Sequence, residues 1–123
     1  MQNVLLIDDD AFTRGVVRRM LENLECTVTE AEDGRIASTK LDADDFDLVV
    51  TDIFMPNQDG IETIRKIRRS HNDVCILAIS SDEYSYRINY LKMAERIGAN
   101  FALKKPIQVE QLANILRSIR ETV

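Results

Sequence analysis

Short apolar runs alternate with amphipathic segments along the chain. The apolar runs are residues 4–7, 27–29, 48–50, 74–79 and 101–103. Most of them contain apolar residues only, a pattern typical of parallel strands that are covered on both faces of a sheet. We therefore predict five short β-strands at these positions.

The segments between the runs carry apolar residues at helical spacing. A helix start is indicated where Asp59 precedes Gly60 and Glu62 follows three residues after the cap. Gly98 is placed to end another helix, since glycine often follows the last helical turn. The clearest apolar stripes are Val17, Met20, Leu21 and Leu24; Ile61, Ile64 and Ile67; and Val109, Leu112, Leu116 and Ile119.

Strand and helix patterns thus alternate five times. Units this short predict an α/β fold with a parallel sheet, right-handed crossovers and helices on both faces. The 123 residues show no linker and no repeat, so we predict one domain over residues 1–123, without room for an output domain.

Charge and hydropathy exclude several classes of protein. The net charge is −5, which argues against nucleic acid as a direct partner. The first long apolar run ends at Asp8 and has no basic segment before it, so it predicts neither a membrane span nor a signal peptide. Residues 1–60 hold 14 acidic and 5 basic residues, whereas residues 61–123 hold 7 acidic and 11 basic residues.

Chemically capable side chains follow four of the five predicted strands. In parallel open sheets, functional residues gather beyond the carboxyl ends of the strands. Only Glu30, Glu32 and Asp33 follow the second strand. The residues at the other strand ends are Asp8, Asp9 and Asp10; Asp52; Ser80 and Ser81; and Lys104, Lys105 and Pro106.

Asp8, Asp9 and Asp52 converge if the first and third strands are neighbours. Clustered carboxylates without His or Cys favour a hard cation, Mg²⁺ or Mn²⁺. With the Lys105 ammonium and the Ser80 hydroxyl nearby, such a site could stabilise phosphoryl oxygens while a carboxylate acts as nucleophile. The alternative is that these acids only cap helices and solvate loops. That explanation would suffice for one acid at a strand end, but it does not account for the whole set at four strand ends.

These residues give the chain its resemblance to the receiver domains of two-component response regulators. Residues 5–10 resemble the acidic pair after the first strand of that family. Asp52 to Pro56 with Gly60 resembles its D-x-x-M-P-x-x-x-G signature, Ser80 its Ser/Thr position, and Lys105-Pro106 its K-P pair. The likeness covers nearly the whole chain, with all four motifs in order.

The resemblance implies a fold and a role for each residue. The fold would be the flavodoxin-like (βα)5 sandwich with strand order 2-1-3-4-5, in which Cys26 and Cys75 lie too far apart for a disulfide, and Lys105-Pro106 would be cis. Asp52 would accept the phosphoryl group. The other implied roles are Mg²⁺ ligation by Asp9, Asp52 and the Phe54 carbonyl, with Asp8 acting through water; pairing of Lys105 with the phosphoryl group; and switching by Ser80.

The resemblance also implies partners. The phosphoryl donor would be a sensor histidine kinase or a histidine phosphotransfer protein in the bacterial cytoplasm. The face made by the fourth helix, fifth strand and fifth helix would then bind a downstream protein, with phosphorylation-dependent dimerisation as one outcome. Slow self-dephosphorylation would be its only chemistry, so we expect a signalling switch rather than an enzyme.

Three positions depart from the family pattern or modify it. Ala102 occupies the place where the family usually has an aromatic switch residue, and strand alternation turns Phe101 to the opposite face. Phe54 and Asp82 flank the expected path of the attacking water. We expect Phe54 to hinder that water and Asp82 to orient it, which would set the lifetime of the phosphorylated state.

Two other readings remain open at this stage. The Asp8-x-Asp10 pattern also fits haloacid-dehalogenase-type phosphohydrolases, with Asp8 as nucleophile. Those enzymes need a second acidic pair beyond their lysine, and here no acid follows Lys105 before Glu110. The other reading is a receiver-like interaction module with an inactive site, against which the complete set of site residues argues.

Overall fold

The strands form one parallel sheet. The computed structural model describes residues 2–53, 60–71, 73–80 and 90–121. The sheet order is β2-β1-β3-β4-β5, as the resemblance implied. The strands are β1 (Gln2–Ile7), β2 (Cys26–Ala31), β3 (Leu48–Asp52), β4 (Cys75–Ser80) and β5 (Phe101–Lys104).

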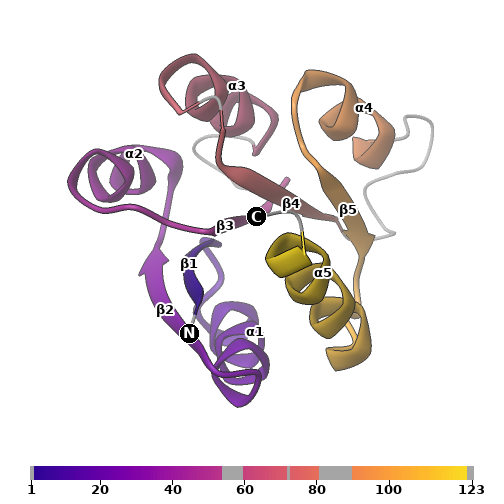
Figure 1. Cartoon of the computed structure of the whole chain (residues 1–123). Coiled ribbons are helices and arrows are strands. Elements are labelled where there is room, and N and C mark those ends of the chain that lie inside the picture. Colours follow the sequence, from indigo (N-terminus) through magenta and orange to yellow (C-terminus); the bar gives the residue numbers. More distant parts are fainter. Residues whose placement is uncertain (1, 54–59, 72, 81–89, 122–123) are drawn as a thin grey trace.

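Helices cover both faces of the sheet (Figure 1). Helices α1 (Ala11–Asn23) and α5 (Val109–Glu121) lie on one face. Helices α2 (Gly34–Ala43), α3 (Gly60–Ser70) and α4 (Tyr90–Ile97) lie on the other. Each helix follows its strand, so all five βα turns are at the same edge of the sheet, where the carboxyl ends of the strands lie.

Alternation along each strand divides the core into two layers. In β1, Val4 and Leu6 pack with the α1 and α5 side, while Leu5 and Ile7 pack with the α2, α3 and α4 side. All four of these side chains are buried because β1 lies inside the sheet and is covered on both faces. The predicted α/β architecture is therefore confirmed.

Two helices begin at aspartates that follow strands. The Asp10 carboxylate accepts a hydrogen bond from the Thr13 amide at the start of α1, and the Asp33 carboxylate accepts one from the Ile36 amide at the start of α2. Capping satisfies amides that have no partner within the helix. The capping explanation is thus correct for Asp10 and Asp33.

Arg68 ties α3 to the far end of α4. Its Nε donates to the Gly98 carbonyl at 2.9 Å, and its Nη1 donates to the Val74 carbonyl at 2.6 Å. Its Nη2 donates to Asn100 Oδ1 at 2.7 Å. Gly98 ends α4 with φ of 138°, where its amide donates to the Ala94 carbonyl, and this confirms the predicted helix end.

Several details differ from the sequence expectation. Val74 lies just before β4, and Glu30 lies within β2 instead of after it. Val109 is 38% exposed, and Ile115 is buried although the predicted stripe did not include it. Helix α5 begins at the edge of the sheet, so the side chain of its first residue, Val109, has little of the sheet to pack against.

The cysteines and the peptide before Pro106 agree with expectation. Cys26 and Cys75 are free, because two strands separate β2 from β4. The Lys105–Pro106 peptide bond is cis. No helix among the described residues is both long enough and apolar enough to cross a membrane.

Candidate functional site

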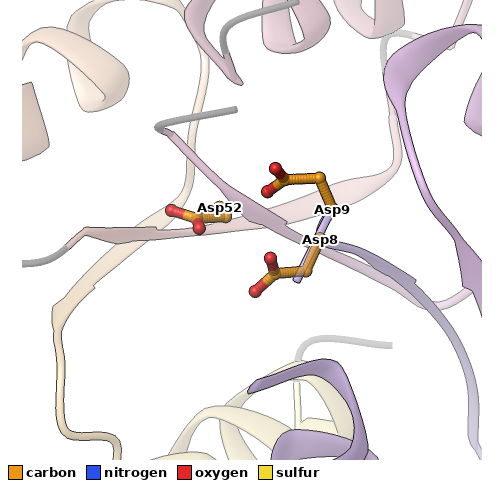
Figure 2. Close-up of side chains that lie close together, drawn as sticks. All are labelled: Asp8, Asp9 and Asp52. Carbon is orange, nitrogen blue, oxygen red and sulfur yellow. The ribbon is translucent and has the colours of Figure 1, made fainter. Parts of the chain in front are cut away.

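Three carboxylates meet where β1 and β3 end. Ile7 of β1 pairs with Thr51 of β3, so Asp8 and Asp52 follow side by side on adjacent strands. Oxygens of Asp8, Asp9 and Asp52 all lie within 4.8 Å of one another (Figure 2). Asp8 and Asp52 are buried, whereas Asp9 is exposed to solvent. The structure therefore brings together the three acids that the strand ends predicted.

Lys105 contributes a positive charge to the same cluster. Its Nζ lies 3.1 Å from Asp52 Oδ2 and 3.8 Å from Asp8 Oδ2. The residue directly follows β5, and its amide donates to the Ser80 carbonyl at 2.8 Å, which fixes its main chain against the end of β4. The ammonium thus reaches across β4 toward the carboxylates.

Ser80 lies at the same edge of the sheet. It is 1% exposed and comes one residue after Ile79, which pairs with Asp52 in the register of β3 and β4. Ser80 is therefore the last residue of the strand beside the central acid, as the sequence indicated.

Gly60 allows the chain to pass close to the back of Asp52. A β-carbon at position 60 would lie 2.2 Å from the Asp52 carbonyl oxygen and 2.5 Å from the Ile53 α-carbon. The Gly60 amide also donates to the Ile53 carbonyl at 2.6 Å. The start of α3 is thus packed directly against the main chain of Asp52, an approach that only glycine permits.

Burial sets the electrostatics of Asp8. Burial, together with the smaller effect of the negative charge of Asp52, raises the pKa of its carboxyl group from 3.8 to about 6. The hydrogen bond donated by the Asp10 amide acts in the opposite direction. The positive charge of Lys105 lowers this pKa but does not outweigh burial. The acids therefore repel one another in the protein without a cation.

The donor set fits a hard divalent cation. It offers carboxylate oxygens and neither nitrogen nor sulfur, the ligand chemistry that Mg²⁺ and Mn²⁺ prefer. The exposed Asp9 leaves the cluster open to solvent on one side, so a cation could keep part of its water shell. A divalent charge here would also offset the repulsion that raises the pKa of Asp8.

Comparison with known proteins decides the family. Residues 4–117 match the model of the response regulator receiver domain. The chain belongs to this family. The match includes both halves of the sheet and every residue of the acidic cluster, so the receiver-domain interpretation of the sequence is confirmed.

Relatives of this receiver domain include signalling proteins that are longer than it is. It is 35% identical to the response regulator MprA of Mycolicibacterium vanbaalenii, over 94% of this chain and 49% of that protein. It is 30% identical to the sensor protein EvgS of Escherichia coli K12, over 97% of this chain and 10% of that protein. The chain thus spans half of one relative's length and a tenth of the other's.

One solved structure with the same fold is a complex with Mg²⁺ and BeF. The response regulator TrrA of Thermotoga maritima, in complex with Mg²⁺ and BeF, has a TM-score of 0.82 and 26% identity to this receiver domain. The match covers 97% of this chain and 99% of that one.

Some predicted site residues lie outside the described residues. These are Phe54 and Asp82, whose roles stay predictions, and the predicted helix cap Asp59. Ala102 is described: it pairs with Ala78 of the layer under α4, while Phe101 packs into the opposite layer. Strand alternation at this position is therefore as predicted.

Sequence reasoning missed two residues near the site, of which Arg14 contacts its main chain and Glu30 binds Arg14. Arg14 of α1 donates to the Asp8 carbonyl, and Glu30 of β2 binds Arg14. A signal for Arg14 existed, because it lies one helical turn after the cap Asp10 and so returns toward the end of β1. Nothing in the local pattern pointed to Glu30, since its partner is 16 residues away.

The raised pKa of Asp8 gives a pH-dependent prediction. Since its pKa is higher in the folded than in the unfolded chain, its ionisation lowers stability as the pH rises from about 4 to about 6. In EDTA at pH 8, Asp8→Asn should raise the free energy of unfolding by roughly 2–3 kcal/mol, because a pKa shift of one unit corresponds to about 1.36 kcal/mol. Urea unfolding at pH 8 and below pH 4 measures this.

Below pH 4 the gain from Asp8→Asn should vanish, because Asp8 is then neutral in both states. Asp45→Asn, on an exposed loop, is the matched control and should change stability little at either pH. An equal gain from Asp8→Asn at both pH values would contradict the electrostatic explanation.

Proposed function

We propose that this receiver domain accepts a phosphoryl group on Asp52 in a Mg²⁺-dependent reaction. The observation that supports this most directly is the position of Lys105 Nζ, 3.1 Å from Asp52 Oδ2, beside two further carboxylates. An ammonium next to a nucleophilic carboxylate can pair with the phosphoryl group as it arrives. No hydrolytic base is required for this step.

The proposed step makes one bond and breaks one. An oxygen of the Asp52 carboxylate bonds to phosphorus, and the phosphorus–nitrogen bond of a phosphohistidine breaks, leaving its electron pair on the imidazole nitrogen. Mg²⁺, held by Asp8, Asp9 and Asp52, would supply charge neutralisation for the phosphoryl oxygens. Lys105 would pair with one phosphoryl oxygen and the Ser80 hydroxyl would donate to another.

The difference in burial between Asp8 and Asp9 supports separate roles for these two acids. Asp8 is buried and has a raised pKa, so it is suited to hold a cation through water. Asp9 faces solvent on the side from which a cation would enter. The carbonyl of Phe54, two residues after Asp52, stays a predicted ligand, and Phe54 and Asp82 stay predicted modulators of the phosphate lifetime.

A surface next to the site supports a protein phosphodonor. Phe12, in the first turn of α1, is 80% exposed, and Val16 on the next turn is 41% exposed. They line a shallow hollow together with Ala11, Gly15 and Arg19. An exposed apolar patch beside the acidic cluster fits the docking of a histidine kinase or phosphotransfer protein.

The proposed output is contact through α4, β5 and α5, with dimerisation of the phosphorylated chain as one form of it. Slow loss of the phosphoryl group to water would reset the domain, so we propose a switch and not an enzyme with its own substrate. We propose the cytoplasm as its location, because a kinase's phosphohistidine is formed there from ATP.

The test of this function is to find which aspartate is labelled. The protein is incubated with acetyl phosphate and Mg²⁺, trapped with borohydride and mapped by peptide mass spectrometry. We expect the label on Asp52 and its loss in EDTA. Label on Asp8 would instead support the hydrolase reading, and no label on either residue would support an inactive interaction module.

A further inference from the structure

A chain of ionic contacts runs from the surface of α1 to the main chain of the site. Arg18 binds Glu30 with Nη1, and Glu30 accepts a hydrogen bond from Arg14 Nε at 2.7 Å. Arg14 Nη1 then donates to the Asp8 carbonyl oxygen at 2.6 Å. The Arg14 side chain is only 14% exposed, so its bond to the Asp8 carbonyl is largely shielded from water.

The guanidinium group of Arg14 is held from two sides. Its Nε contacts Glu30 on the edge strand β2, and its Nη1 contacts the end of the neighbouring strand β1. A planar guanidinium can make both bonds at once in a fixed direction, which a lysine ammonium on a flexible stem cannot match. The hydrogen bond from Arg14 lowers the pKa of Glu30, so Glu30 is ionised at neutral pH.

The Asp8 carbonyl belongs to the peptide group that joins Asp8 to Asp9. The amide of Asp8 donates to the Ala31 carbonyl at 3.1 Å, and its carboxylate accepts from the Asp10 amide at 2.9 Å. The bond from Arg14 fixes the Asp8 carbonyl as well. Rotation of that peptide group would change the direction in which the exposed Asp9 side chain leaves the main chain.

We propose that Arg14 is a positioning residue: held by Glu30, it fixes the Asp8–Asp9 peptide group so that both carboxylates face Asp52. This inference rests on the proposed function, in which these carboxylates hold Mg²⁺. Arg14 touches none of the reacting atoms. Its effect is on the geometry of the cation site, in the same way that residues hydrogen-bonded to metal ligands govern metal affinity.

Arg18 provides a matched control on the same helix. It binds the same Glu30 carboxylate and also Glu22, but no contact links it to the main chain of Asp8. Arg14→Met and Arg18→Met remove the same charge and keep a similar apolar stem. The two variants therefore separate the loss of positive charge near β2 from the loss of the bond to Asp8.

The experiment measures Mg²⁺ affinity by calorimetry and, in EDTA, the amide resonances of Asp9 and Asp10. Arg14→Met should raise the Mg²⁺ dissociation constant about tenfold. It should also shift both amide resonances before any metal is added. Arg14→Lys should weaken binding as well, since it keeps the charge but not the fixed geometry. Arg18→Met should stay within about twofold of the parent protein.

An unchanged Mg²⁺ affinity in Arg14→Met, or an equal loss in Arg18→Met, would overturn the inference. If Arg14→Met does not fold, Glu30→Gln is measured instead, because it removes the ion pair that holds Arg14 but leaves the guanidinium that donates to the Asp8 carbonyl. This variant should weaken Mg²⁺ binding by a smaller factor. An unchanged Mg²⁺ affinity in Glu30→Gln counts against the inference. If the parent protein itself binds no Mg²⁺, the proposed function fails, and that result is distinct from parent-like binding by the variants.

Discussion

Asp52→Asn should abolish phosphoryl uptake, with a loss on the order of a thousandfold or more in rate, because no other group replaces a missing nucleophile. The amide has nearly the same shape, and Lys105 Nζ can still approach its oxygen. We therefore expect the variant to fold. Phosphorylation by acetyl phosphate and by a panel of histidine kinases, followed by phosphate-affinity electrophoresis, measures the loss.

Asp45→Asn is the control for this variant, since Asp45 is exposed and follows α2 at the opposite edge of the sheet. It should take up phosphate at the parent rate. Phosphate uptake by Asp52→Asn that is mapped to Asp8 or Asp9 would show that the cluster can use another nucleophile, and it would count against the assigned role of Asp52.

Gly60→Ala should lower the free energy of unfolding by on the order of 3 kcal/mol. The added β-carbon would lie 2.2 Å from the Asp52 carbonyl oxygen, and this neighbour is main chain in a buried central strand. The strand cannot move without breaking sheet hydrogen bonds, and Gly60 cannot move without breaking the hydrogen bond from its amide to the Ile53 carbonyl. Urea unfolding followed by circular dichroism measures the change.

Gly15→Ala is the matched control, because it makes the same substitution within another helix. Apart from its chain neighbours and the main chain of its own helix, no atom of the described residues lies within 4 Å of a β-carbon at Gly15. Alanine there should stabilise the protein by roughly 0.5–1 kcal/mol, the usual difference between the two residues in a helix interior. Similar losses in both variants would mean that the close approach at Gly60 does not control the effect.

The fold was predictable because its hydrophobic pattern has few solutions. Buried parallel strands need apolar residues on both faces, as residues 48–50 of β3 show, and strands of this kind need helices as connections. The same logic predicted the site, since Asp8, Asp52 and Lys105 each directly end or follow a strand. Parallel topology alone brings such positions to one edge.

Other features depended on contacts that no local pattern encodes. Val109 fits the apolar stripe of its helix, yet it is exposed because the helix begins at the edge of the sheet. Glu30 looked like a loop residue because its strand ends in a partly polar segment, and only the packing of α1 on β2 reveals its ion pairs. The spacing around Gly60 marked a motif, but only the structure shows the close approach that requires glycine.

The contacts of Arg68 have a mechanical consequence. They clamp the last turn of α4, through the Gly98 carbonyl, to α3 and to the start of β4. A helix that is fixed at one end moves most at its other end. A displacement at the site edge of the sheet would therefore swing the first turn of α4 about its fixed last turn. The amplitude of any such swing is therefore set at the edge of the sheet opposite Asp52.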